Sequence, residues 1–344
     1  MASLKLVAIA KDEAAYLPEW IYHHLRIGFD EIDVYLNGIT DNSFKVMRRI
    51  CARHSNVNFY NADSLVGISN RAKRSFQHVI YRFAWKTEQS KRNFSHLAFL
   101  DIDEYLLSES FDQNVKKMFR SAGQFDVLSN LWYSDLPGKV EPFSRFFVDS
   151  LELQKMSVVK SVGRLSSNLG SPMVHNFTGI KRKPHKIKSV LSNGATIQYS
   201  ALGKRLSDHD VERCASTIEP WFVFHRIYRS HLEYCASLMR GRKHRANDAP
   251  IKDNRFGYVR RQGSRQAIGK TFRHQISSEK NSHYQRGFEK FLDECNLENQ
   301  LEVGRESVRK KFRALEALLQ EQPDIIDRYS NVFNGTVFEK KASS

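Results

Sequence analysis

Cysteines are scarce in this chain, and none has the spacing of a metal-binding or redox motif. The 344 residues contain four of them, at Cys51, Cys214, Cys235 and Cys295. No two form a CxxC pair, and none lies at zinc-ligand spacing from another. This pattern disfavours a cysteine-based zinc site, and we expect reduced thiols that are mostly buried.

Long apolar runs are also absent. No window approaches the roughly 18 consecutive apolar residues that a membrane-spanning helix needs. The short apolar run at residues 4–10 is followed at once by Asp12 and Glu13, is too short for a signal peptide and has no small-residue cleavage site after it. We therefore expect a cytoplasmic protein without a membrane-spanning segment.

Acidic residues are few in the second half of the chain. Residues 1–150 carry 19 Lys and Arg against 18 Asp and Glu, whereas residues 151–344 carry 35 against 20, and the net charge is +16. This excess favours an anionic partner, which is a membrane phospholipid, a nucleic acid or an acidic or phosphorylated glycan. A solvated face rich in Lys and Arg explains the same charges, and both interpretations stay open.

What the sequence does contain is a regular alternation of apolar patterns in its first half. The hydrophobic content of 41% is sufficient for a core. The patterns predict strands at residues 4–10, 31–37, 57–61 and 96–101, with helices at 14–27, 42–54 and 68–85 between them. Such alternation predicts an α/β fold with a mostly parallel central sheet and helices on both faces.

After about residue 138 the alternation fades. The expected elements are a strand just before it at 126–133, strand-like residues at 155–205, a strand at 221–227, a helix at 230–240 and an amphipathic helix at 300–321. Ser230 and Glu233 have capping-box spacing. Residues 240–274 carry 11 Lys and Arg against 2 Asp, which predicts a long surface loop. We divide the chain into one domain over 1–240, with halves at 1–138 and 139–240, and a basic loop with a C-terminal helical extension over 241–344.

Two carboxylates, Asp101 and Asp103, follow the predicted strand at 96–101. Open α/β sheets bind ligands at the carboxyl ends of their strands. Because residues two apart in an extended chain point the same way, this pair is able to share one Mn²⁺ or Mg²⁺ ion. Such an ion bridges a diphosphate and neutralises charge on a leaving nucleotide. A solvated acidic turn is the alternative, since DxD alone is common.

The segment Lys11-Asp12-Glu13 follows the first predicted strand, and Asn37 follows the second. We expect Lys11, Glu13 and Asn37 to line a nucleoside pocket at the same sheet edge. Alternatively, Asp12 only caps the helix that comes next.

Three further residues are candidates for binding. Arg71 and Lys73 lie near the start of the helix predicted at 68–85, where a diphosphate or a sugar hydroxyl is favourably bound. A solvated helix face explains them equally well. His225 lies among apolar residues and, as neutral imidazole, is able to complete a site with Asp101 and Asp103. A lone histidine in such surroundings is more often a hydrogen-bonded core residue.

Several of these segments together resemble a known family, the family 92 glycosyltransferases and their bacterial family 2-like relatives. Residues 11–28, KDEAAYLPEWIYHHLRIG, are similar to its opening pattern (K/E)(D/N)E..YL.EW..YH...G. The other matching segments are VYLN at 34–37, DNS at 41–43, FLDIDE at 99–104 and HRIYRSHLEY at 225–234, the last resembling HY..KS.EEF. The resemblance covers roughly residues 5–245 in the right order.

The resemblance implies a GT-A fold and transfer of a hexose from a nucleotide-diphosphate sugar, of the UDP-sugar type, to a glycan or lipid-linked acceptor in cell-surface polysaccharide synthesis. It also implies a divalent ion on Asp101 and Asp103, with His225 as third ligand, and inversion at the anomeric carbon. Residues 132–138, WYSDLPG, depart from the family's W..FG..G, and the basic segment after residue 240 has no counterpart that we can assign.

An inverting enzyme needs a carboxylate that deprotonates the acceptor hydroxyl. Asp135 follows a predicted core strand and is the first candidate, with Asp208 and Asp210 next. Each of the three is also readily explained as an ordinary surface acid.

Two other functional classes fit parts of the sequence. The basic second half favours a nucleic-acid-binding protein, but no RNA-binding or helix-turn-helix signature occurs, and Asp101 with Asp103 would repel phosphate unless a metal lay between them. We therefore expect no nucleic-acid partner. A catalytically inactive GT-A scaffold that binds nucleotide sugars without turnover is the other alternative.

The basic segments 240–274 and 181–188 suggest how the chain reaches a lipid-linked acceptor. Each Lys or Arg near an anionic bilayer contributes ~1 kcal/mol to binding. We expect these segments to hold the chain peripherally at the inner face of a membrane, or on an anionic acceptor. A solvated loop is the competing interpretation.

Overall fold

The structure is a computed structural model that describes residues 2–71, 75–166, 169–179, 187–200, 203, 205–240, 249–259 and 267–339. Of the predicted positions, Lys73, residues 181–186 and residues 241–248 and 260–266 of the basic segment lie outside this part of the chain.

The first half of the chain forms the parallel part of a ten-stranded sheet. The order of its strands is β3-β2-β1-β4, and all three of these pairings are parallel. The strands are β1 (Leu4–Ala10), β2 (Glu31–Leu36), β3 (Val57–Asn61) and β4 (His96–Phe99), and helices α1 (Leu17–Arg26) and α2 (Ser43–Arg53) connect the first three. This part of the predicted α/β fold is confirmed.

The helix predicted at residues 68–85 was wrong in its bounds, because two helices occupy this connection. They are α3 (Asp63–Arg71) and α4 (Phe76–Lys91). The backbone of Ser75 is extended, and its side chain accepts a hydrogen bond from the backbone N–H of His78. Ser75 therefore starts a new helix as an N-cap, a signal that apolar periodicity alone does not contain.

The second half of the sheet is mixed. It continues from β4 in the order β7-β6-β11-β5, with antiparallel pairs except for the parallel pair of β6 and β11. These strands are β5 (Glu104–Ser108), β6 (Val127–Asp135), β7 (Ser150–Arg164) and β11 (Trp221–His225). Strand β10 (Ser189–Leu191) pairs with β6, β12 (Phe272–Gln275) pairs with β7, and β8 (Leu169–Pro172) pairs with β9 (Phe177–Gly179) in a separate small sheet.

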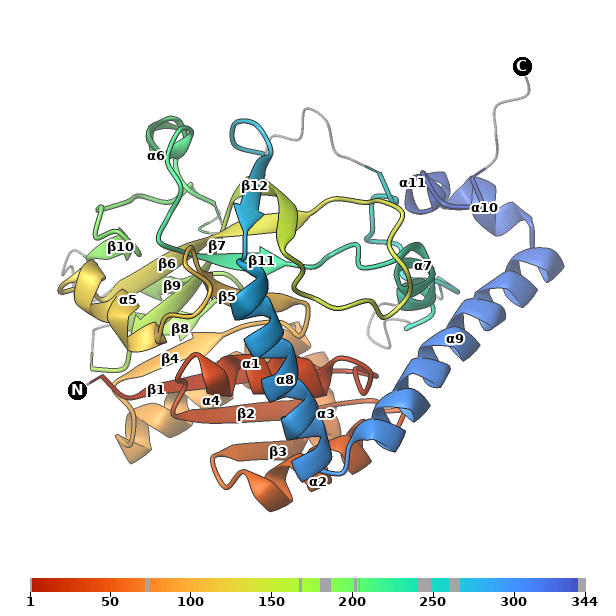
Figure 1. Cartoon of the computed structure of the whole chain (residues 1–344), viewed down its shortest axis with the longest axis horizontal. Helices are drawn as coiled ribbons and strands as arrows, with labels where there is room; N and C mark the ends of the chain where they lie inside the picture. The colour runs from red at the N-terminus through yellow and green to blue at the C-terminus, as the bar shows by residue number, and fades with distance from the viewer. Residues whose placement is uncertain are drawn as a thin grey trace.

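The remaining helices include the predicted C-terminal extension. They are α5 (Val115–Ala122), α6 (Asp208–Cys214), α7 (His231–Leu238), α8 (Ser278–Glu294), α9 (Glu298–Glu321), α10 (Asp324–Arg328) and α11 (Ser330–Phe333). Helix α9 runs along the right edge of the molecule in Figure 1 and packs against α2 and α7. The predicted capping box of Ser230 and Glu233 is confirmed at the start of α7. Because β12 joins the main sheet, residues beyond 240 extend the sheet as well as adding helices.

Helices cover both faces of the parallel sheet, as predicted. On one face, Leu6 and Ala8 of β1 belong to the core that contains Trp20 of α1. On the other face, Val7 belongs to the core that contains Trp85 of α4. Successive residues of β1 therefore face opposite cores, which is why the strand reads as a continuous apolar run.

The four cysteines are free thiols, and all except Cys51 are buried, as expected. No helix within the described ranges has the length and apolar character that a membrane crossing requires.

Helix α9 approaches the turn after β1 so closely that only glycine fits at position 304. A Cβ there would lie 2.8 Å from the backbone nitrogen of Ala15 and 2.9 Å from the carbonyl carbon of Ala14. We expect Gly304→Ala to lower the free energy of unfolding by ~1–3 kcal/mol, because backbone must shift to relieve the overlap. Urea unfolding measures this change.

Gly67→Ala is the matched control. This glycine lies in α3, and nothing comes within 4 Å of a Cβ built on it. The control should be neutral or gain up to ~1 kcal/mol from helix propensity. Equal stability of the two variants would show that α9 is not packed against the turn.

Candidate functional site

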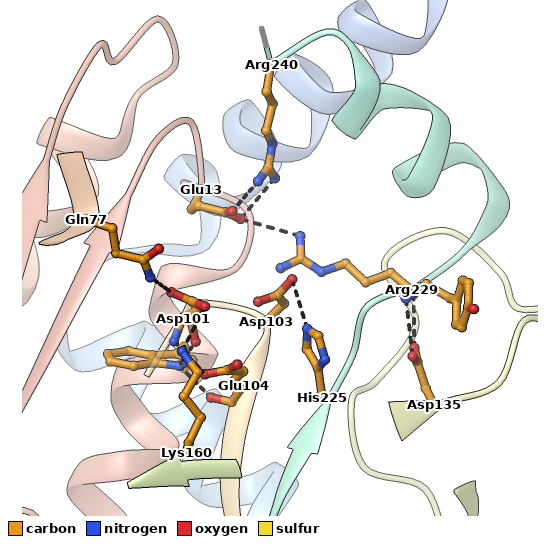
Figure 2. Close-up of polar contacts among 12 residues, drawn as sticks. Glu13, Gln77, Asp101, Asp103, Glu104, Asp135, Lys160, His225, Arg229 and Arg240 are labelled. Atoms are coloured by element: carbon orange, nitrogen blue, oxygen red, sulfur yellow. Dashed lines mark hydrogen bonds and ion pairs between the residues drawn. The ribbon is translucent and has the colours of Figure 1, made fainter. Parts of the chain in front are cut away.

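The candidate site lies where the order of the parallel strands reverses. The chain runs from β1 outward through β2 to β3 and then returns to the other side of β1 with β4. The carboxyl ends of β1 and β4 carry Glu13 and Asp101, and the end of β11 carries His225. Such a reversal is where open α/β sheets bind ligands. Figure 2 shows the side chains that meet there.

Both carboxylate oxygens of Asp101 have partners within the protein. Oδ1 accepts hydrogen bonds from Gln77 Nε2 at 3.0 Å and from the hydroxyl of Tyr81 at 3.4 Å. Oδ2 accepts from Nζ of Lys160, a residue of β7, at 3.0 Å. The same ammonium lies 3.1 Å from Oε2 of Glu104.

The Lys160 ammonium is fully enclosed and charged. Its side chain is 1% exposed, and that of Glu104 is 0% exposed. Burial alone would lower the pKa of Lys160, but Asp101 and Glu104 outweigh it and raise that pKa. Burial raises the pKa of the Glu104 carboxyl to about 7. Lys160 is therefore a resident cation beside Asp101.

Asp103 and His225 lie side by side. The distance from Asp103 Oδ2 to His225 Nε2 is 3.7 Å, and the imidazole packs against the ring of Trp132. Burial would raise the pKa of Asp103, but the neighbouring imidazole of His225 and the charge of Arg229 outweigh it and hold that pKa well below its usual range.

The predicted three-ligand metal site is only partly assembled. Within the part of the chain that the structure describes, no group of three or more His, Cys, Asp or Glu side chains is placed to hold a metal ion. Asp101 is bonded to Lys160 instead, which leaves Asp103 and His225. Two protein ligands with open positions fit Mg²⁺ or Mn²⁺, which often complete their shells with water and substrate phosphates.

Glu13 is held by two arginines from the distant part of the chain. Arg240 binds both carboxylate oxygens of Glu13, with Nη2 at 3.0 Å from Oε2, and Arg229 Nη1 lies 3.4 Å from Oε2. The Arg229 guanidinium stacks on the ring of Tyr16 at 3.5 Å from its centroid. Nζ of Lys11 donates to the carbonyl oxygen of Arg240 at 2.7 Å.

Asp12 does not cap the first helix, so that alternative was wrong. Helix α1 begins at Leu17 without a side-chain cap. Asp12 instead accepts hydrogen bonds from the backbone N–H of Thr40 at 2.6 Å and from Lys311 Nζ of α9 at 2.7 Å. Its backbone has φ of 53°. The carboxylate therefore fixes a tight turn that presents Glu13 at the sheet edge.

The two other residues that were predicted to bind the nucleotide sugar, Asn37 and Arg71, lie in different places. Asn37 is half-buried after β2, and its N–H donates to the carbonyl oxygen of Ala10, which places it beside Lys11. Arg71 is exposed at the end of α3 and, among the described residues, makes no hydrogen bond or ion pair with Asp101 or Glu13.

Of the three candidate bases, the structure brings only Asp135 to the site. Asp135 ends β6 next to β11 and accepts hydrogen bonds from the backbone N–H groups of Tyr228 at 3.2 Å and Arg229 at 3.1 Å. Burial raises its pKa to about 6. Asp208 is exposed in the first turn of α6, a helix that precedes the amino end of β11. In Figure 1, α6 lies far from α7, so Asp208 is remote from the site. Asp210 is buried and accepts from the N–H of Gln198 at 2.7 Å, which is a structural contact.

Sequence reasoning missed four of the polar residues at the site, which are Gln77, Lys160, Arg229 and Arg240. Two of them left a signal. Lys160 interrupts an apolar strand, and a buried lysine requires a partner. Arg229 stands in HRIYRS, where the resembled pattern HY..KS has its lysine. Gln77 and Arg240 carry no such signal.

Comparison with known proteins gives partial structural overlap only. No family model matches the chain, and no curated protein does. Among solved structures, similarity is found to HddC from Yersinia pseudotuberculosis, with a TM-score of 0.32, 13% identity, and coverage of 56% of this chain and 92% of that one. For S. aureus TarS 1–349 in complex with UDP, the TM-score is 0.28, identity is 15%, and coverage is 48% of this chain and 47% of the other.

A third structure is the galactosyltransferase LgtC in complex with donor and acceptor sugar analogues. It has a TM-score of 0.25 and 18% identity, and the match covers 47% of this chain and 58% of LgtC. The match to a longer TarS chain spans 28% of that chain. Because these overlaps are partial and their TM-scores low, the chain's own residues carry the functional proposal.

The resident cation Lys160 offers a test of the site's electrostatics. Lys160→Met leaves the carboxylates of Asp101 and Glu104 without their ammonium, so we expect the free energy of unfolding to fall by ~3–5 kcal/mol. In a Glu104→Gln background the same substitution should cost less, because one buried charge is already gone. Urea denaturation of the four proteins of this cycle measures the coupling. Additive effects would mean that Lys160 does not compensate Glu104.

Proposed function

We propose that the chain is a GT-A glycosyltransferase that transfers a sugar from a nucleotide-diphosphate sugar, of the UDP-sugar type, to a glycan or lipid-linked acceptor. One observation carries the proposal. The residues of the KDE and FLDIDE segments, far apart in sequence, meet at the reversal point of the sheet, and His225 of the HRIYRS segment lies 3.7 Å from Asp103.

The donor is placed across this sheet edge. In this proposal the nucleoside would lie beside Lys11 and Asn37, and the diphosphate would lie toward Asp103 and His225. Asp103 and His225 would hold a divalent ion, which would supply positive charge to the leaving diphosphate. Lys160 keeps the Asp101 carboxylate fixed and partly neutralised, so that this carboxylate does not repel the donor.

Binding measurements test this assignment directly. We expect UDP with Mn²⁺ to raise the melting temperature, with a stabilisation of ~2.7 kcal/mol when the ligand is at 100 times its Kd. Asp103→Asn and His225→Gln should abolish the part of the shift that depends on Mn²⁺, whereas the exposed Asp208→Asn should keep it. Stabilisation by oligonucleotides and not by UDP would favour the nucleic-acid-binding alternative.

Retained UDP binding without transfer to any acceptor would favour the inactive scaffold. A panel of nucleotide sugars in the same thermal assay identifies the donor.

Asp135 is the proposed general base of an inverting reaction. Its carboxylate lies one residue beyond the strand position that pairs with His225, and a pKa of about 6 leaves it ionised near neutral pH. A base must be ionised to accept the acceptor's proton, so the rate should fall as the pH drops through about 6. Asp135→Asn should reduce kcat by ~10²–10⁴-fold and remove this pH dependence.

The stability contributed by Asp135 changes with pH in the opposite direction to the expected activity, which distinguishes a loss of catalysis from unfolding. Burial raises the pKa of Asp135 from 3.8 to about 6 in the folded state, so the folded state binds more protons than the unfolded state across that range. This group therefore lowers stability as the pH rises, and stability is regained on acidification. If activity in the Asp135→Asn variant shows the same acid limb as the native protein, another group is responsible.

Peripheral attachment to an anionic membrane through the basic segment 240–274 stays part of the proposal. Arg240 is not available for it, because its guanidinium is bound to Glu13 and its side chain is 16% exposed.

A further inference from the structure

We propose that Arg229 and Arg240 form a clamp for the donor's diphosphate, and that Glu13 positions the clamp and does not contact the nucleoside. This inference deepens the proposed function and rests on it for the identity of the ligand. The clamp itself, the buried guanidinium of Arg229 beside the partly buried one of Arg240, rests on geometry alone.

The two guanidinium groups converge on one carboxylate. Glu13 is 8% exposed, and both of its oxygens accept from Arg240, with Arg229 on Oε2 as well. Because they share a single carboxylate, the two groups lie close enough together to contact one diphosphate. Glu13 offsets one of the two guanidinium charges, and the other faces the Asp103 carboxylate and any anion that binds there.

Arg229 has more N–H groups than its contact with Glu13 uses. Its guanidinium carries five N–H groups, and among the described residues it donates one hydrogen bond, from Nη1 to Glu13 Oε2 at 3.4 Å. Phosphate oxygens match the planar fork of arginine in pairs, which makes a phosphate the acceptor of choice.

The clamp is held rigidly. Arg229 has φ of 53°, an unusual backbone conformation for a residue with a side chain, and Asp135 fixes it by accepting its N–H at 3.1 Å. The side chain stacks on Tyr16. Figure 2 shows the guanidinium extending across the site toward Glu13 and lying beside Asp103. An arginine ordered before binding loses little entropy when the ligand arrives.

This arrangement changes the role predicted for Glu13. A nucleoside contact requires a carboxylate that faces the ligand, but the Glu13 carboxylate is enclosed between two arginines. Substitution of Glu13 should therefore weaken binding of phosphate-containing ligands and leave binding of the nucleoside alone unchanged.

Isothermal titration with uridine, UDP and inorganic pyrophosphate tests the clamp in the full-length chain. The variants Arg240→Lys and Arg229→Lys keep the positive charge but lose the paired N–H donors of the guanidinium. The variant Glu13→Gln keeps the shape of the side chain but loses its ion pairs with the two arginines. We expect each variant to weaken UDP and pyrophosphate binding by about 10- to 100-fold, as loss of charged hydrogen bonds does, with uridine affinity unchanged. The control is Arg309→Gln, which removes an exposed ion pair with Glu302 on α9 and should change none of the three affinities.

Folding of each variant is verified by its melting temperature. Should Glu13→Gln or a single arginine variant unfold, the double variant Glu13→Gln with Arg240→Gln removes both charges of the pair together and gives the same expected loss. An equal loss of uridine and UDP affinity in Glu13→Gln overturns the inference, because it makes Glu13 a nucleoside contact. Unchanged pyrophosphate and UDP affinity in both arginine variants overturns it as well.

The two proposals fail in different ways. Arginine-dependent pyrophosphate binding without any UDP binding by the native chain supports the clamp and overturns the donor assignment. UDP binding that is insensitive to Arg229 and Arg240 overturns the clamp and leaves the donor assignment standing.

Discussion

The site depends on the neutralisation of carboxylates at the strand ends by cations from the second half of the chain. Asp101 and Glu104 share Lys160, Asp103 lies against His225, and Glu13 is held by Arg229 and Arg240. A buried carboxylate without such a partner costs several kcal/mol. Glu13 and Glu104, the buried carboxylates of this set, therefore depend on cations that β7 and the residues flanking α7 bring to them.

This pairing explains part of the uneven charge distribution along the chain. The excess of Lys and Arg after residue 150 was open to two interpretations, an anionic partner or a solvated face. Lys160, Arg229 and Arg240 belong to that excess, yet their side chains are 1%, 9% and 16% exposed. Part of the positive charge is thus used inside the protein, opposite carboxylates of the more balanced first half.

The C-terminal helices contribute to the same site from outside the sheet. Lys311 of α9 binds Asp12, and Gly304 of the same helix allows α9 to approach Ala14 and Ala15. The turn that carries Glu13 is therefore fixed by the sheet on one side and by α9 on the other. A turn restrained in this way keeps Glu13 between its two arginines without a change in backbone conformation.

The sequence by itself determined the elements whose signal is local. Short apolar runs placed β1 to β3 and helical periodicity placed α2 and α9, each within a few residues, and the FLDIDE segment put two carboxylates at a strand end. Tertiary structure alone decided which charges meet. Asp101 and Lys160 are 59 residues apart, and Glu13 and Arg240 are 227 apart. A residue's type shows that it needs a partner when buried, but the partner is chosen by the packing of the sheet and of α7, because a short-range electrostatic contact depends on positions in space that no local pattern contains.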